Sequence, residues 1–160
     1  MKYRPLRQDT AIQFRELILQ HTPDAVGRWG KLNALTMLTH LCRTLEMSLG
    51  HYVAKDESNF FTRTVFMRRL IFEWMPWPKG KIKGPEYVTP TPQGDFLHER
   101  ERLLALLEEF VGEHQKNPQR TTQNPILGKL SLQYWSIIHG RHICWHLEQF
   151  RLDTKSLKIS

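Results

Sequence analysis

Three histidines near the end of the sequence recur at helical spacing, on the side of the predicted helix that also carries its large apolar residues. At about 100° per residue, this face of a helix over residues 131–150 groups Leu132, Trp135, His139, His142, Ile143, His146, Gln149 and Phe150. The polar side of the same helix groups Gln133, Arg141, Glu148 and Arg151. A buried imidazole without a partner costs about 1–3 kcal/mol. The segment therefore predicts a long amphipathic helix whose core-facing histidines need polar partners.

His142 and His146 are the two histidines best placed to share such a partner. Residues four apart lie one above the other on a helix, so both rings can reach one ion. Neutral imidazole is also the commonest metal ligand in proteins. The alternative is that each ring is hydrogen-bonded to a neighbour in a packed core. We interpret the pair as half of a metal site.

Apolar periodicity and capping residues predict four further helices, over about residues 10–20, 33–50, 59–75 and 95–111. Asn33 is a good N-cap and Gly50 a good stop signal for the second, Pro76 ends the third, and Gly112 ends the fourth. No segment is predicted to be a strand. The expected fold class is all-α: a four-helix bundle of the second to fifth helices, with an extra N-terminal helix laid across them.

Three connecting regions complete the predicted organisation of residues 1–160, which we expect to form a single domain. Residues 76–92 are rich in proline and glycine and predict a long crossover loop. Residues 113–124 are polar and rich in turn formers. The tail after Phe150 is expected to be frayed or only loosely packed.

Overall composition limits the classes of protein to consider. The chain has no apolar run near the roughly 18–20 residues that a membrane span needs and no apolar signal-peptide region after its first residues. We therefore expect a cytoplasmic protein with no membrane partner. Cys42 and Cys144 fall within apolar helical patterns and are expected to be core thiols.

The net charge of +7 raises the alternative of nucleic-acid binding. Basic residues gather at Arg63, Arg68 and Arg69 and again at Lys79, Lys81 and Lys83. No nucleic-acid-binding motif accompanies them, and charge balance alone is weak support. A solvated positive face, which would also steer small anionic substrates, is the favoured interpretation.

A metal held by two histidines of the last helix needs a third ligand from a facing helix. The other histidines are His21, His40, His51, His98, His114 and His139. His40 is favoured because it lies in the middle of its helix, on a face of threonines and methionines without charge. His139 shares the face of His142 and is left open, as a ligand or as an outer hydrogen-bond partner.

Four sequence segments then resemble the DinB-like superfamily, also described as YfiT-like metal-dependent hydrolases. They are WGKLNALTMLTHL at 29–41, MPWPKGK at 75–81, PILGKLS at 125–131, and the pattern W…HxxxHxxQF at 135–150. Together they span about residues 29–150 in the family's order. The chain departs from the family in having Trp145 beside His146, where two adjacent histidines are frequent, and Arg151 where a glycine is frequent.

The resemblance implies a four-helix bundle with a divalent ion, zinc or nickel, held by His40, His142 and His146. It also makes a homodimer plausible and implies a low-molecular-weight thiol as co-substrate, since characterised relatives include thiol transferases. Three ligands leave a coordination position open, which is typical of catalytic ions.

We therefore expect a thiol S-transferase or hydrolase acting on a small electrophile. The alternative is a non-catalytic bundle that binds a protein partner or nucleic acid through the basic face. No carboxylate is predicted as general base, because Glu46 and Glu148 face away from the histidines and Glu73 lies near a helix end. Gln149 is expected to orient a ligand or substrate.

Overall fold

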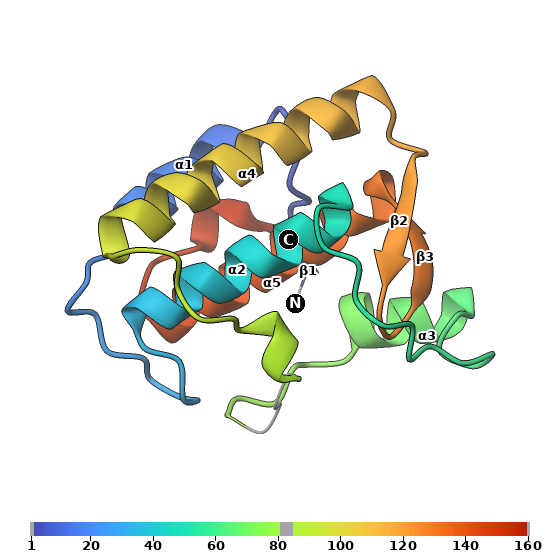
Figure 1. The fold of residues 1–160 in the computed structure, drawn as a ribbon, viewed down its shortest axis with the longest axis horizontal. Coiled ribbons are helices and arrows are strands. Elements are labelled where there is room, and N and C mark those ends of the chain that lie inside the picture. Colours follow the sequence, from blue (N-terminus) through green and yellow to red (C-terminus); the bar gives the residue numbers. More distant parts are fainter. Residues whose placement is uncertain (1, 81–84, 160) are drawn as a thin grey trace.

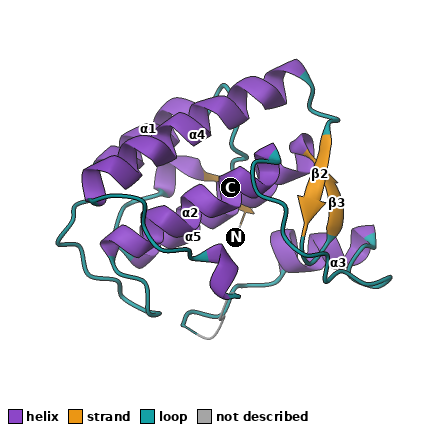
Figure 2. Cartoon of the chain, viewed as in Figure 1, coloured by secondary structure: helices purple, strands orange, loops and turns teal. Residues whose placement is uncertain are grey.

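The structure of the protein is a computed structural model that describes residues 2–80 and 85–159, and helices predominate in it (Figures 1 and 2). The α-helices of the described residues are α1 (Ala11–Leu19), α2 (Ala34–Leu49), α3 (Val65–Arg69), α4 (Phe96–Lys116) and α5 (Leu132–Gln149). The helical class predicted from the sequence is confirmed. The prediction that no segment is a strand is wrong, because two short antiparallel pairs of strands are present.

The long helices pack around one apolar core. α1 and α4 lie side by side, and α2 packs against both α4 and α5 (Figure 1). Completely buried side chains at their contacts include Leu38, Leu45, Leu103, Phe110 and Leu147. Each such side chain contributes about 1.5–3 kcal/mol through removal from water, so the positions of α2 and α5 are strongly fixed relative to each other.

α2 begins and ends where its capping residues predict. The Asn33 side chain accepts a hydrogen bond from the Thr36 amide at 2.8 Å, and Thr36 Oγ1 accepts one from the Asn33 amide at 2.9 Å, which completes a capping box. Gly50 ends the helix in the left-handed region with φ of 82°. Both faces of α2 are buried, so His40 points into the protein rather than to open solvent.

The segment predicted as a helix over 59–75 is helical only in its second half. α3 continues into a π-helical turn, η1 (Leu70–Trp74), and no residue of either is buried. The N-cap is Thr64, whose hydroxyl accepts from the Met67 amide at 3.3 Å. Residues 59–63 instead form turns closed by Asn59 and Thr62.

α4 is longer than predicted because Gly112 does not end it. The helix continues to Lys116 and stops before Pro118, whose ring disfavours helical backbone in the residue before it. A single glycine costs a helix only about 1 kcal/mol, and the buried Phe110 and Val111 hold the chain in place just before it.

A β-hairpin occupies the region predicted as polar connector and lead-in to the last helix. β2 (Thr121–Asn124) pairs with β3 (Gly128–Ser131), with Thr121 opposite Ser131. The Asn124 side chain accepts hydrogen bonds from the amides of Ile126 and Leu127 and so closes the turn. Ser131 then caps α5 by accepting from the Tyr134 amide at 3.2 Å, as its sequence position predicts.

The tail is packed rather than frayed, which corrects the expectation for residues after Phe150. β4 (Lys158–Ile159) pairs with β1 (Lys2–Tyr3) after a 3₁₀ turn, η3 (Lys155–Leu157), and Leu157 is completely buried. The N-terminal segment also crosses α5 at Gly140. A Cβ there would lie 2.2 Å from the carbonyl oxygen of Arg4, so only glycine fits.

The described parts of the predicted crossover, 76–80 and 85–92, are loop apart from a 3₁₀ turn, η2 (Glu86–Val88). Lys81 and Lys83 of the predicted basic face lie outside the described residues. Among the described residues, none of the helices has the length and apolar character that crossing a membrane would require.

Candidate metal centre

The three histidines predicted as ligands come together between α2 and α5. His142 Nε2 lies 2.9 Å from His40 Nε2 and 3.1 Å from His146 Nε2. One ring nitrogen from each residue falls within 4.8 Å of the others, a grouping that could hold a metal ion. His146 is buried, while His40 and His142 keep partial exposure.

In two of these rings, the nitrogen that points away from the cluster is hydrogen-bonded to a carbonyl oxygen. His40 Nδ1 lies 2.8 Å from the Val88 carbonyl oxygen of η2, and His146 Nδ1 lies 2.9 Å from Gln149 Oε1. A carbonyl oxygen only accepts, so each Nδ1 donates and each Nε2 carries the lone pair. The Gln149 amide nitrogen donates to the Trp29 carbonyl, which fixes the orientation of the amide.

This arrangement fits a divalent cation. Both His40 Nε2 and His146 Nε2 carry a lone pair and lie close to His142 Nε2. If His142 carries its proton there, this single N–H can donate one well-aligned hydrogen bond, to only one of the two, and the other lone pair has no partner. A cation satisfies all three. Tetrahedral zinc with Zn–N bonds near 2.0–2.1 Å would place ligand nitrogens about 3.3 Å apart, close to the two separations that His142 Nε2 makes with His40 and His146. Ligating histidines also commonly donate their second N–H to an oxygen, as these do.

The rings are neutral at ordinary pH, which is the form that binds metals. Burial lowers the pKa of His40 to about 4 and that of His146 to about 3. Burial, together with the neighbouring His146 and His40, also lowers the pKa of His142 well below its usual value. Little proton competition for the three ligand nitrogens therefore remains near pH 7.

His139 is a core residue rather than a fourth member of the cluster. Its Nε2 lies 2.8 Å from Ser48 Oγ, and its ring stacks on Trp135 with centroids 5.4 Å apart. His21, His51 and His114 likewise have separate partners, which are the Ala34 carbonyl, Glu109 and Gln133.

Tryptophans border the cluster. The Trp145 ring is 4.8 Å from the ring of His146, and the Trp77 ring is 6.0 Å from that of His142. Arg141, on the predicted polar side of the helix, is nevertheless buried, and its side chain lies under η1. It lies 4.6 Å from the Trp77 centroid and donates to the Ile71 and Met75 carbonyls.

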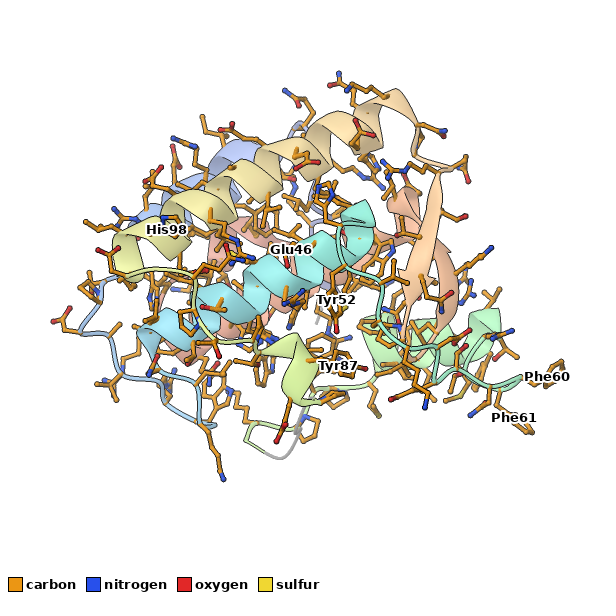
Figure 3. All side chains as sticks on the ribbon, in the orientation of Figure 1. Glu46, Tyr52, Phe60, Phe61, Tyr87 and His98 are labelled. Atoms are coloured by element: carbon orange, nitrogen blue, oxygen red, sulfur yellow. The ribbon has the colours of Figure 1, made fainter. Side chains whose placement is uncertain are left out.

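Glu46 and Glu148, which are predicted to face away from the histidines, are paired with other residues. Glu46 lies at the boundary of α2 and α4 and pairs with Arg102 and Arg43 (Figure 3). Glu148 accepts hydrogen bonds from Tyr3 and Thr154. Cys42 and Cys144 are buried free thiols, also as predicted.

Sequence reasoning missed the contribution of η2. The Val88 carbonyl and Thr89 Oγ1, at 2.8 Å and 3.2 Å from His40 Nδ1, come from the predicted crossover loop. In Figure 3, Tyr87 of this turn lies beside Tyr52, which follows α2, and their rings stack with centroids 6.5 Å apart. A backbone carbonyl leaves no side-chain signal, so no motif could have found it.

Comparison with known proteins adds no relative. No protein-family model, no curated protein and no solved structure matches the chain.

Proposed function

We propose that the protein is a metal-dependent enzyme in which His40, His142 and His146 hold one divalent ion, zinc or nickel. The observation that carries this proposal is the convergence of three imidazole nitrogens, two of them with their tautomer fixed by carbonyl oxygens on the other side of the ring. Three protein ligands leave room for a substrate atom, as in catalytic sites.

The proposed reaction class is thiol transfer to, or hydrolysis of, a small electrophilic substrate. A bound zinc or nickel ion lowers the pKa of a water or thiol beside it and so supplies a nucleophile near neutral pH. The residues of the chain have supporting tasks. Gln149 and the Val88 carbonyl hold the ring protons of His146 and His40, and Trp77 and Trp145 shield the cluster from water.

We also propose that the chain is a DinB-like four-helix bundle. Support comes from where the four resembling segments lie. Trp77 lies beside His142, and the Trp29 carbonyl accepts a hydrogen bond from Gln149 of the histidine segment. Residues 125–131 form the end of the hairpin that leads into α5. Residues that the resemblance connects only by sequence are thus neighbours in space.

The metal proposal is tested by elemental analysis of the purified full chain after equilibration with zinc or nickel. About one ion per chain is expected, with loss in His40→Ala and in His146→Ala. His51→Ala is the matched control, because the same side chain is removed from an exposed position paired with Glu109. A stoichiometry that is unchanged in His40→Ala, or equally reduced in His51→Ala, contradicts the proposal.

A homodimer is the proposed assembly, through large apolar side chains that project from the region of α3 and η1. Phe60 and Phe61 are 82% and 73% exposed and point away from the helices (Figure 3). Val65, Phe66 and Trp74 extend this surface. Sedimentation of the wild type and of a Phe60→Ser, Phe61→Ser double variant tests the proposal. A monomeric wild type contradicts it.

The rival function, binding of nucleic acid through the basic face, receives less support. Arg63 pairs with Asp56 at 2.9 Å, and Arg68 donates to the carbonyls of Leu127 and Lys129. These guanidinium groups are occupied within the protein. The cytoplasmic location remains a prediction from the sequence.

A further inference from the structure

A positively charged cavity of about 580 Å³ lies beside Trp29 and the end of α5. Its wall combines two loops with the end of α5 and the residues after it: Arg28, Trp29, Lys79, Glu148, Arg151 and Lys158. Small-molecule sites in proteins are typically about 300–1,000 Å³. The cavity is thus large enough for a metabolite-sized ligand.

The acidic residues of the wall are already partnered. Glu148 lies 3.0 Å from Lys158 Nζ and accepts hydrogen bonds from Tyr3 at 3.0 Å and Thr154 at 2.5 Å. Burial raises the pKa of Glu148, but the hydrogen bonds from Thr154, Lys158 and Tyr3 outweigh it and hold the pKa below its usual value. The carboxylate therefore stays ionised and neutralises Lys158.

Three cations of the wall have no such partner. Asp153 pairs with Lys155 at 3.5 Å, which leaves Arg28, Lys79 and Arg151 without an ion pair among residues 2–80 and 85–159. Lys79 Nζ is 4.6 Å and Arg28 Cζ is 5.9 Å from the centroid of the Trp29 ring. Two like charges are thus gathered at one aromatic ring, an arrangement that a bound anion would stabilise.

Arg151 provides a second and independent observation. It follows α5 with φ of 69° and is the one non-glycine residue with positive φ in the described chain. Its amide donates to the Glu148 carbonyl and the Leu152 amide donates to the Leu147 carbonyl, the pattern of a Schellman motif. Glycine is the favoured residue at this position, because a side chain there costs about 1–2 kcal/mol. An arginine in a strained conformation at the wall of a basic cavity indicates a task for its charge.

The cavity is connected to the histidine cluster through one side chain. Gln149 donates to the Trp29 carbonyl and accepts from His146 Nδ1, so a wall residue of the cavity and a predicted metal ligand share the same amide. The Trp145 ring lies between them as well, 5.6 Å from the Trp29 ring and 4.8 Å from the His146 ring.

We propose that this cavity binds the phosphate group of a small-molecule substrate. The assignment of the bound molecule as substrate rests on the proposed function, whereas phosphate binding itself does not. Arginine pairs with phosphate through two parallel hydrogen bonds, and lysine adds a point charge. A concave cavity with two of its unpaired cations at one tryptophan fits a compact anion better than an extended nucleic-acid backbone.

Titration calorimetry of the metal-free full chain with inorganic phosphate, at low ionic strength, tests the proposal. Saturable binding of one phosphate is expected. Arg151→Gly should weaken it about tenfold or more while raising the melting temperature, because glycine suits the left-handed position. Lys79→Gln, at an exposed position, should also weaken binding about tenfold. Lys55→Gln removes the same charge from an exposed position away from the cavity and should change affinity less than about twofold.

Absence of saturable binding, or equal weakening by Lys55→Gln and Lys79→Gln, overturns the proposal. Tighter binding of a single-stranded oligonucleotide, with steep salt dependence and loss in the same variants, also overturns it in favour of nucleic acid. The His40→Ala variant separates this inference from the metal proposal. Phosphate binding should persist in that variant. A wild-type protein that binds phosphate but no metal would contradict the metal proposal and leave the phosphate site standing.

Discussion

His139 and His142 are one helical turn apart on the same face of α5, yet they have different surroundings. His139 meets Ser48 near the end of α2, whereas His142 meets His40, two turns earlier on that helix. Burial lowers the pKa of both rings. One is a hydrogen-bonded core residue and the other a candidate ligand. The residue opposite on the facing helix, and not burial or helical position, decides which task a histidine has.

The largest expected difference between the two positions is in metal affinity. His142→Ala should weaken zinc binding by more than the roughly 100-fold that loss of an outer partner causes, because a proposed ligand itself is removed. His139→Ala should leave the stoichiometry unchanged, because its ring lies outside the cluster. Competition with a chromogenic chelator measures both affinities. Equal losses of zinc affinity in the two variants would contradict the assignment of His142 as a ligand and His139 as a core residue.

Stability should respond mainly to His139 in the metal-free chain. His139→Ala should lower the free energy of unfolding by about 2–4 kcal/mol, through a cavity beside Phe110 and the loss of the hydrogen bond to Ser48. Urea unfolding measures this value. A double-mutant cycle with Ser48→Ala should give a coupling of about 1 kcal/mol. Additive effects would mean that the 2.8 Å contact contributes nothing.

Loss of the Gln149 side chain should have a smaller effect, and mainly on the metal. Gln149→Leu removes the acceptor that orients His146, and should weaken zinc binding about 10–100-fold. The same chelator competition measures it. Gln13→Leu, at a half-buried position of α1 away from the cluster, is the control. Full zinc affinity in Gln149→Leu would show that His146 needs no oriented tautomer.

Acid should destabilise the metal-free protein gradually. The pKa of His139 is about 3 and that of His40 about 4, both below the ordinary 6.5, so the unfolded chain binds more protons between these values. The contribution of these two histidines to the free energy of unfolding is complete above pH 6.5 and is lost as the pH falls toward 3. The loss is about 1.4 kcal/mol per pH unit for each proton that the unfolded chain binds in excess of the folded chain. His139→Leu should make the dependence shallower by up to one proton. Urea unfolding at pH 7, 6 and 5 measures the slope, and equal slopes in the two proteins would contradict the pKa of His139.

The clustering of His40, His142 and His146 could be predicted from the sequence because two of the three lie on one helix. The spacing of His142 and His146 fixes two ligands on one helix face, and the uncharged surroundings of His40 indicate the third. The Ser48 partner of His139 could not be predicted, since it depends on how α2 and α5 align lengthwise. Long-range packing also explains the burial of Arg141, which requires η1 to lie across α5.

The departures in the rest of the fold have similar causes. Strands of two to four residues, such as β2 and β4, are too short for alternation to be visible in the sequence. The length of α4 depended on which of two stop signals prevails, and Pro118 acts through a steric clash that Gly112 lacks.

The missing side chain at Gly140 links the first residues of the chain to the helix that carries His142 and His146. The backbone at Arg4 and Pro5 fills the notch on α5, Leu6 donates its amide to the Ser136 carbonyl, and the Leu6 side chain is completely buried. Trimming of residues 2–6 by a protease would therefore uncover the back of α5 and loosen the spacing of its histidines, although none of the removed residues belongs to the cluster. Resistance of the amino terminus to digestion would then report how firmly α5 and its histidines are held in place.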